Sequence, residues 1–133
     1  MWELADAVPP MVRAFWEQRV VAAYEAKQYA AAFEESFRVL ELAAVTRSRA
    51  VGGPEGFAAA IDWLLKRSFI KPRYNSALPG ELWATAVRAR NRFSHHQSVD
   101  FPMVLNRAMC DDTFGMFVSM LDELWETARA PSA

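Results

Sequence analysis

A helical pattern of apolar residues runs through Phe33-Glu34-Glu35-Ser36-Phe37-Arg38-Val39-Leu40-Glu41-Leu42-Ala43-Ala44. The apolar positions follow the spacing i, i+4, i+7 and i+11, which places them on one face of an α-helix: Phe33, Phe37, Leu40 and Ala44. Glu34 and Arg38 are opposite charges four residues apart, a pair that stabilises a helix. The stretch therefore predicts a long amphipathic helix, which the turn residues Val51–Pro54 bring to an end.

Helical spacing also governs the sequence on both sides of this stretch. An earlier pattern opens at Pro9-Pro10 and ends near Lys27. A loop is expected over residues 71–80, and a further pattern runs from near Pro79 toward His95. Between the central stretch and this loop lies a shorter helical pattern, marked by Phe57, Ile61, Leu64 and Leu65.

The final segment carries an unbroken apolar seam with spacings of 7, 4, 3, 4, 3 and 4 residues: Met103, Cys110, Phe114, Phe117, Leu121, Leu124 and Ala128. Asp100 is expected to cap this helix, with Pro102 in its first turn. Asp111–Thr113 and Gly115 are points at which the helix could kink or split. Because sustained strand alternation and hairpin-turn dipeptides are missing from the sequence, we expect an all-α fold. The expected architecture is an antiparallel bundle of four to five helices, forming a single domain over residues 1–133.

Several classes of protein are excluded by the composition. Cys110 is the only cysteine, so neither an internal disulfide nor a multi-cysteine zinc site can form. The acidic start lacks the basic residues and apolar run of a secretion signal, and no apolar stretch approaches the ~18–20 residues that span a bilayer. We therefore expect a cytoplasmic protein without a membrane partner. Met1 and the final Ala-Pro-Ser-Ala indicate a whole chain.

The net charge of −1 conceals an uneven distribution of charge along the chain. Residues 1–46 carry −3, residues 47–99 carry +6 and residues 100–133 carry −4. A basic segment between acidic ends is typical of a protein that binds an anionic ligand, whereas solvated cations in the last turns of helices are the alternative explanation. If the segment binds an anionic ligand, four other cations should lie near Arg90 in space: Arg47, Arg49, Lys66 and Arg73.

The densest group of side chains that could bind an anion or transfer a proton lies in this basic segment, at residues 88–97. These residues read Arg-Ala-Arg-Asn-Arg-Phe-Ser-His-His-Gln. Helical geometry places Arg90 inside an apolar arc, where it requires either a carboxylate of the chain or an anionic ligand. Asn91 and His95 share a helix face, so the amide can orient the imidazole. An arginine that grips a phosphate and a histidine that transfers protons suit cleavage of RNA by its own 2′-hydroxyl, which requires no metal. A helix end whose cations complement the helix dipole is the structural alternative.

The hexapeptide Arg90-Asn91-Arg92-Phe93-Ser94-His95 resembles the signature of the HEPN superfamily, which is an arginine, a polar residue, three further residues and a histidine. In that family the motif lies late in a helix of an all-α bundle, close to the start of the last helix, and residues 10–128 are similar in this context. The resemblance implies a HEPN-like fold and a metal-independent ribonuclease whose homodimer brings two motifs together in one cleft. On this basis we expect an endoribonuclease that acts in phage defence, as a toxin of a toxin–antitoxin pair or in stress.

The resemblance also implies a role for each residue of the motif. Arg90 would bind and stabilise the scissile phosphate, His95 would act as acid and base, and Asn91 would support the pair. On a straight helix Arg90 and His95 point about 140° apart, which independently favours a homodimer. Three further basic residues are expected to contact the RNA substrate: Arg88, Arg92 and His96.

Several alternatives stay open at the level of sequence. His96 also fits the looser spacing that the family permits for the key imidazole. Gln97 stands where some HEPN toxins carry a tyrosine that a partner nucleotidyltransferase modifies, so we expect an antitoxin or other regulatory protein to act differently. Neither a metal nor a cofactor is expected, because the adjacent histidines diverge by about 100° and only Asp100 lies near them. The alternative functions are a non-catalytic HEPN-type module that binds nucleotide, RNA or a partner protein, and a purely structural bundle.

Overall fold

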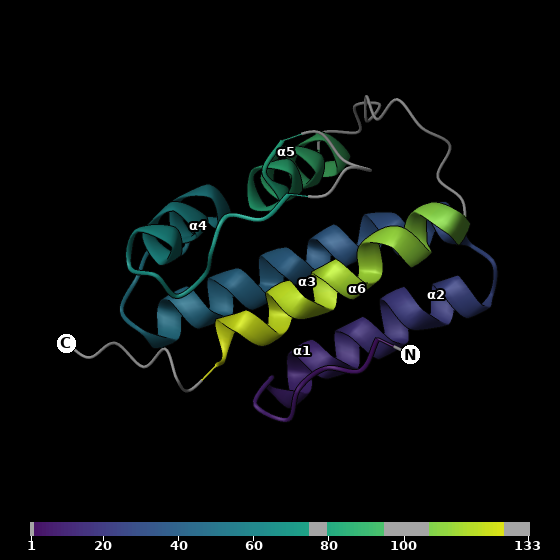
Figure 1. The fold of residues 1–133 in the computed structure, drawn as a ribbon, viewed down its shortest axis with the longest axis horizontal. Helices are drawn as coiled ribbons and strands as arrows, with labels where there is room; N and C mark the ends of the chain where they lie inside the picture. Colours follow the sequence, from purple (N-terminus) through teal and green to yellow (C-terminus); the bar gives the residue numbers. More distant parts are fainter. Residues whose placement is uncertain (1, 75–79, 95–106, 127–133) are drawn as a thin grey trace.

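The computed structural model describes residues 2–74, 80–94 and 107–126 (Figure 1). Within these ranges the chain forms helices and no strand, and one isolated bridge joins Tyr74 to Glu81. The prediction of an all-α fold is therefore confirmed. The helices are α1 (Pro10–Phe15), η1 (Trp16–Val21), α2 (Ala22–Glu25), α3 (Tyr29–Ala50), α4 (Phe57–Lys66), α5 (Leu82–Ser94) and α6 (Arg107–Leu124).

The helices follow the predicted patterns closely. The first pattern becomes α1, η1 and α2 in direct succession, with η1 forming a π-helical stretch inside an otherwise α-helical rod. The expected helix start at Asp100, the apolar positions Met103 and Ala128, and part of the expected loop lie outside the described residues. No helix in the described ranges has both the length and the apolar character that a bilayer span requires.

The end of α3 shows how the turn residues act. Gly52 adopts a φ of 87°, in the left-handed region that glycine enters without steric cost. The Gly53 N–H then donates to the Ser48 carbonyl at 2.7 Å, and a Cβ on Gly53 would lie 2.4 Å from Ser48 Oγ. The predicted stop after Val51 is therefore produced by two glycines with different roles, one conformational and one steric.

The expectation that α6 could kink or split is wrong, because the helix runs without interruption from Arg107 to Leu124. The polar residues within it are satisfied without breaking the helix. Tyr24 donates its hydroxyl hydrogen to Asp111 Oδ1 at 2.6 Å, and Thr113 Oγ1 donates to the Met109 carbonyl one turn earlier at 2.8 Å. The bond from Tyr24 engages the Asp111 carboxylate away from the α6 backbone, and the Thr113 bond satisfies its hydroxyl within the helix.

α3 is the central helix of the bundle and contacts η1, α4, α5 and α6. The rod of α1, η1 and α2 runs antiparallel to it, since Tyr24 contacts Tyr29 while Arg19 reaches Glu35 further along α3. In contrast, α3 and α6 lie side by side and run in the same direction (Figure 1). The expectation of an antiparallel bundle is therefore wrong for this pair, because apolar periodicity does not specify which helix a face meets. α4 and α5 cover another side of α3, so the predicted motif sits on a helix that α3 supports.

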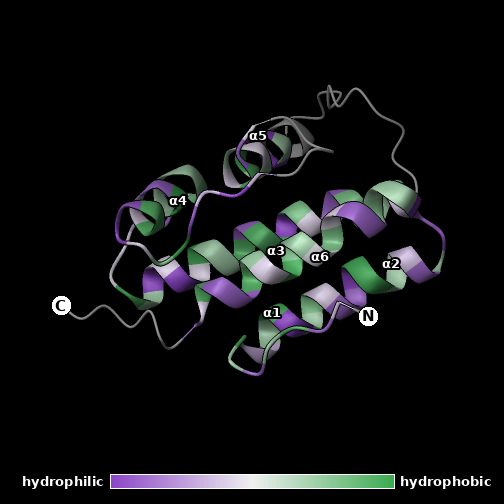
Figure 2. Ribbon diagram, in the orientation of Figure 1, coloured by the Kyte–Doolittle hydropathy of each residue, from purple (hydrophilic) through white to green (hydrophobic). Residues whose placement is uncertain are grey.

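An aromatic cluster fills the space between η1, α3 and α6. Ring centroids are 5.2 Å apart for Phe33 and Phe37, 5.5 Å for Phe37 and Phe117, and 5.5 Å for Trp16 and Phe114. All five side chains are at most 1% exposed. Figure 2 shows that the surrounding helices carry both hydrophobic and hydrophilic residues, as amphipathic helices around a shared core do.

Replacement of Phe37 by alanine tests the importance of this cluster. Because Phe37 is completely buried, Phe37→Ala should lower the free energy of unfolding by about 3–5 kcal/mol, through lost burial and the cavity left behind. Met11→Ala is the matched control, since Met11 is 50% exposed and its truncation should change little. Urea unfolding followed by circular dichroism measures both, and a loss below about 1 kcal/mol for Phe37→Ala would contradict the assignment of the core.

Candidate functional site

The candidate site is built on α5, whose start is fixed by Glu81. The carboxylate of Glu81 accepts hydrogen bonds from the backbone N–H groups of Trp83 and Ala84, which satisfies donors that a helix start leaves open. Trp83 and Ala86 are fully buried in the core that α5 shares with α3. This packing fixes the orientation of α5 and therefore the position of Arg90.

Arg90 forms an ion pair with Glu41 of α3, and its Nε lies 2.8 Å from Glu41 Oε2. The chain therefore supplies the carboxylate that a guanidinium on an apolar arc requires. The pair is not sealed in the core, because the Arg90 side chain is 36% exposed and that of Glu41 is 24% exposed. Arg90 is thus anchored by α3 and accessible to solvent at the same time.

The other residues of the predicted site are described to different extents. Arg88 is exposed, and its Nη2 donates to Thr85 Oγ1 at 3.1 Å. Asn91 and Arg92 are residues of α5 and directly follow Arg90. His95 and His96 lie outside the described residues, so the juxtaposition of Arg90 with an imidazole stays a prediction.

The cations of the basic segment do not converge on Arg90 but bind separate partners. Arg73 Nη2 lies 2.8 Å from Glu123 Oε2 on α6, and Arg47 lies over the ring of Phe69 at 5.4 Å. Burial lowers the pKa of Arg47 from its ordinary value. Two exposed local pairs complete the set: Arg49 with Glu55 at 3.3 Å, and Lys66 with Asp62 at 3.0 Å. Part of the positive charge predicted for ligand binding is therefore balanced within the chain.

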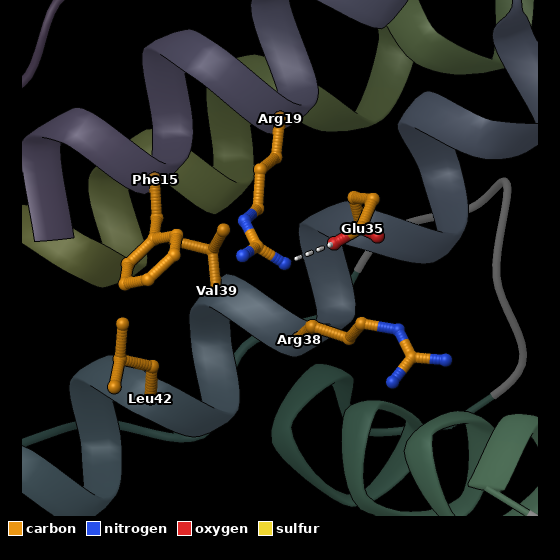
Figure 3. Close-up of a pocket in the computed structure, with 6 residues that line it drawn as sticks. All are labelled: Phe15, Arg19, Glu35, Arg38, Val39 and Leu42. Carbon is orange, nitrogen blue, oxygen red and sulfur yellow. Dashed lines mark ion pairs between the residues drawn. The ribbon is translucent and has the colours of Figure 1, made fainter.

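A separate small pocket of about 180 Å³ lies where α1 and η1 meet α3 (Figure 3). Phe15, Val39 and Leu42 form its apolar side, while Arg19 extends toward Glu35 with a separation of 3.9 Å (Figure 3). No residue that lines it belongs to the predicted motif. The site is therefore assigned to α5 rather than to this pocket.

Two residues important to the site were not predicted from the sequence. In the sequence, Glu41 is only a polar position of the central helical stretch. Glu81 is only a residue near the start of a helical pattern. In the sequence, the signal for this cap is a glutamate placed directly before the apolar pair Leu82-Trp83 that opens the helical pattern. The pairing of Glu41 with Arg90 depends on which helix faces which, and no local signal carries that information.

Outside the motif, the Cys110 thiol is the residue to consider as a nucleophile. Cys110 is fully buried, and burial together with the nearby Asp111 raises the pKa of its thiol to about 11, so the thiolate is not formed at neutral pH. In the described ranges no group of three or more histidine, cysteine or acidic side chains could hold a metal ion. Neither histidine lies within those ranges.

Comparison with known proteins adds no relative. No family model, no curated protein and no solved structure matches the chain.

A double-mutant cycle tests how strongly Arg90 and Glu41 are coupled. Because both side chains are partly exposed, Arg90→Ala and Glu41→Ala combined should reveal a coupling of about 0.2–1 kcal/mol in the free energy of unfolding. The more exposed pair of Arg49 and Glu55 is the control and should couple less. A coupling above about 3 kcal/mol would mean that Arg90 serves as a buried structural charge.

The titration of Glu81 gives a second prediction. Burial raises the pKa of this carboxyl above its ordinary value of 4.5, against the opposing effect of the backbone bonds and Arg88. The folded state therefore favours the protonated form, so the stability that Glu81 contributes is present below pH 4.5 and is lost as the pH rises through the folded pKa. Glu81→Gln keeps a cap acceptor and should lose less stability than wild type over that rise. Urea unfolding across a pH series measures this, and parallel pH profiles would disprove it.

Proposed function

We propose that this protein is a metal-independent endoribonuclease of HEPN type, acting in the cytoplasm in defence, as a toxin or in stress. The supporting observation is that the Arg90-to-His95 motif begins in the late turns of α5, in an all-α bundle whose next described helix is α6. Arg90 is anchored to Glu41 and keeps an exposed fraction of 36%, so its guanidinium is oriented by the chain and accessible from solvent.

Catalysis in this proposal proceeds by attack of the RNA 2′-hydroxyl on the adjacent phosphorus. His95 removes the hydroxyl proton or returns a proton to the departing 5′-oxygen, and Arg90 stabilises the extra negative charge on the phosphoryl oxygens. Asn91 supports the imidazole from the same helix face. The products are a 2′,3′-cyclic phosphate and a 5′-hydroxyl. Arg88, Arg92 and His96 contact the neighbouring phosphates of the strand.

Glu41 has a positioning role in this proposal. A guanidinium carries five N–H donors in a planar fork, so the bond from Nε to Glu41 does not by itself use up the donors of Arg90. The carboxylate fixes the plane of the fork against α3, which lowers the conformational entropy lost when phosphate binds. A homodimer completes the site, because Arg90 and His95 diverge by about 140° on one straight helix.

A non-catalytic HEPN-type module that binds nucleotide, RNA or a partner protein is the alternative. The observation that favours it is the same ion pair, because Glu41 balances the charge of Arg90 without any ligand. Under this alternative, RNA binding survives the loss of Arg90 and His95. An antitoxin or another regulatory protein is a proposed partner under either function.

RNA cleavage in the presence of EDTA distinguishes the two functions. Arg90→Ala and His95→Ala should each reduce cleavage by about 100-fold or more, because each removes a transition-state interaction. Wild-type products should carry 2′,3′-cyclic phosphate ends. Arg49→Ala is the matched control, since it removes another ion-paired arginine of the basic segment and should cleave normally.

The interpretation requires that every variant be folded, which circular dichroism establishes. An RNA pool left intact by folded wild-type protein would refute catalysis on those substrates. RNA binding that is equal in wild type, Arg90→Ala and His95→Ala, with no cleavage by any of them, would establish the binding module instead.

A further inference from the structure

The structure contains a second, larger pocket next to the motif, between α4 and α5. Its volume is about 490 Å³, within the range of roughly 300–1,000 Å³ that small-molecule sites occupy. α4 and α5 lie next to each other on one side of α3 (Figure 1). Most of the lining is apolar and comes from both helices and the link between them: Ala58, Ile61, Leu65, Pro72, Ala84 and Val87.

Four polar side chains line the same pocket: Asp62, Tyr74, Glu81 and Arg88. Asp62 is already ion-paired with Lys66 at 3.0 Å, which leaves the other three for a ligand. Tyr74 is 68% exposed, and together with Met11 it is one of two large hydrophobic side chains exposed in the described ranges. The backbone bridge between Tyr74 and Glu81 holds the tyrosine beside the start of α5. An exposed aromatic ring beside an apolar pocket is a stacking surface for a planar ligand.

Glu81 lines the pocket with a carboxylate that is only half used. Its Oε2 caps α5, whereas its buried Oε1 has no hydrogen-bond partner among the described residues. A buried oxygen without a partner is costly, so a ligand that donates to it gains binding energy.

Arg88 is the cation of this pocket. Its guanidinium donates to Thr85 Oγ1, and no carboxylate in the described ranges pairs with it, in contrast to Arg73 and Arg90. Arg88 is therefore not held in an ion pair there, although its charge acts on the Glu81 carboxyl of the same pocket, and it lies two residues before Arg90 on the same helix. That charge is placed to bind an anionic group of a ligand whose planar part lies in the pocket.

We propose that this pocket binds one unstacked guanine base of the RNA substrate, which rests on the proposed function of the neighbouring motif. Tyr74 stacks on the base, the Glu81 carboxylate accepts hydrogen bonds from its Watson–Crick edge, and Arg88 binds its phosphate. Among the four bases, guanine alone presents two adjacent N–H donors, N1 and N2, and both can be directed at Oε1 while Oε2 stays bonded to the start of α5. Adenine, cytosine and uracil each place an acceptor next to the donor, which the negative carboxylate repels.

Mononucleotide binding tests this pocket without any need for cleavage. Isothermal titration calorimetry should show that guanosine 5′-monophosphate binds about tenfold more tightly than adenosine 5′-monophosphate. Inosine 5′-monophosphate, which keeps N1–H and lacks the 2-amino group, should fall between them. Ribose 5-phosphate should bind weakest, since it offers only the anion. Equal affinity for all four compounds would overturn the proposal and leave a plain phosphate site.

Variants assign the roles within the pocket. Tyr74→Ala should weaken all three nucleotides by about tenfold, whereas Tyr74→Phe keeps the stacking ring and should bind as wild type does. Glu81→Gln should reduce the preference for guanine over adenine, and Arg88→Ala should weaken every phosphate-bearing compound. Arg49→Ala is the folded control and should leave all affinities unchanged. Nucleotide binding that is unaffected by Tyr74→Ala, Glu81→Gln and Arg88→Ala would place the base elsewhere.

The failure of this inference and the failure of the proposed function give different results. Guanine-selective binding by a protein that cleaves no RNA would support the pocket and refute catalysis. Cleavage that depends on Arg90 and His95, with cut sites unchanged in Tyr74→Ala and Glu81→Gln, would support catalysis and refute the pocket. Preferential binding of an apolar peptide over all nucleotides would also overturn the pocket's assignment to RNA.

Discussion

The burial of one face of α3 is the interaction on which the rest of the structure depends. Phe33, Phe37 and Leu40 are completely buried, and every other long segment of the described chain packs against this helix. Because α5 packs against α3 as well, the place of Arg90 follows from core packing rather than from any property of the motif. Glu41 lies one residue after Leu40, so the helix that builds the core also supplies the carboxylate that anchors the arginine.

Charge is the second organising constraint. The acidic ends and the basic middle of the sequence are partly neutralised against each other in three dimensions, through Glu41 with Arg90 and Glu123 with Arg73. The uneven distribution of charge along the chain therefore partly reflects ion pairs between segments that are distant in sequence. What distinguishes Arg88 is that it lines a pocket without forming an ion pair in the described ranges, while Arg90 is anchored and exposed. The proposed RNA-binding surface thus depends on a few placed cations, not on the total charge.

Sequence periodicity predicted the helices well because apolar spacing records burial directly, as at Phe33, Phe37 and Phe117. It could not predict that α3 and α6 run in parallel, nor that Glu41 meets Arg90, since a single helix pattern does not specify its neighbour. The suggested break in α6 is wrong, and Asp111 instead accepts a hydrogen bond from Tyr24, which is far away in sequence. The motif is recognisable from its residue types alone. The pocket lies between α4 and α5 and is lined in part by Pro72 and Tyr74 of the segment that joins them, where the sequence has no periodic pattern.

The central claim is that α5 binds RNA. An RNA oligonucleotide with 2′-O-methyl groups lacks the attacking hydroxyl, so it can be titrated into ¹⁵N-labelled protein without being cleaved. The account predicts that amide chemical shifts change most from Arg88 to Arg92 and around Glu81, with smaller changes along α1. Changes confined to the pocket between η1 and α3, or no changes at RNA concentrations that saturate binding, would contradict it.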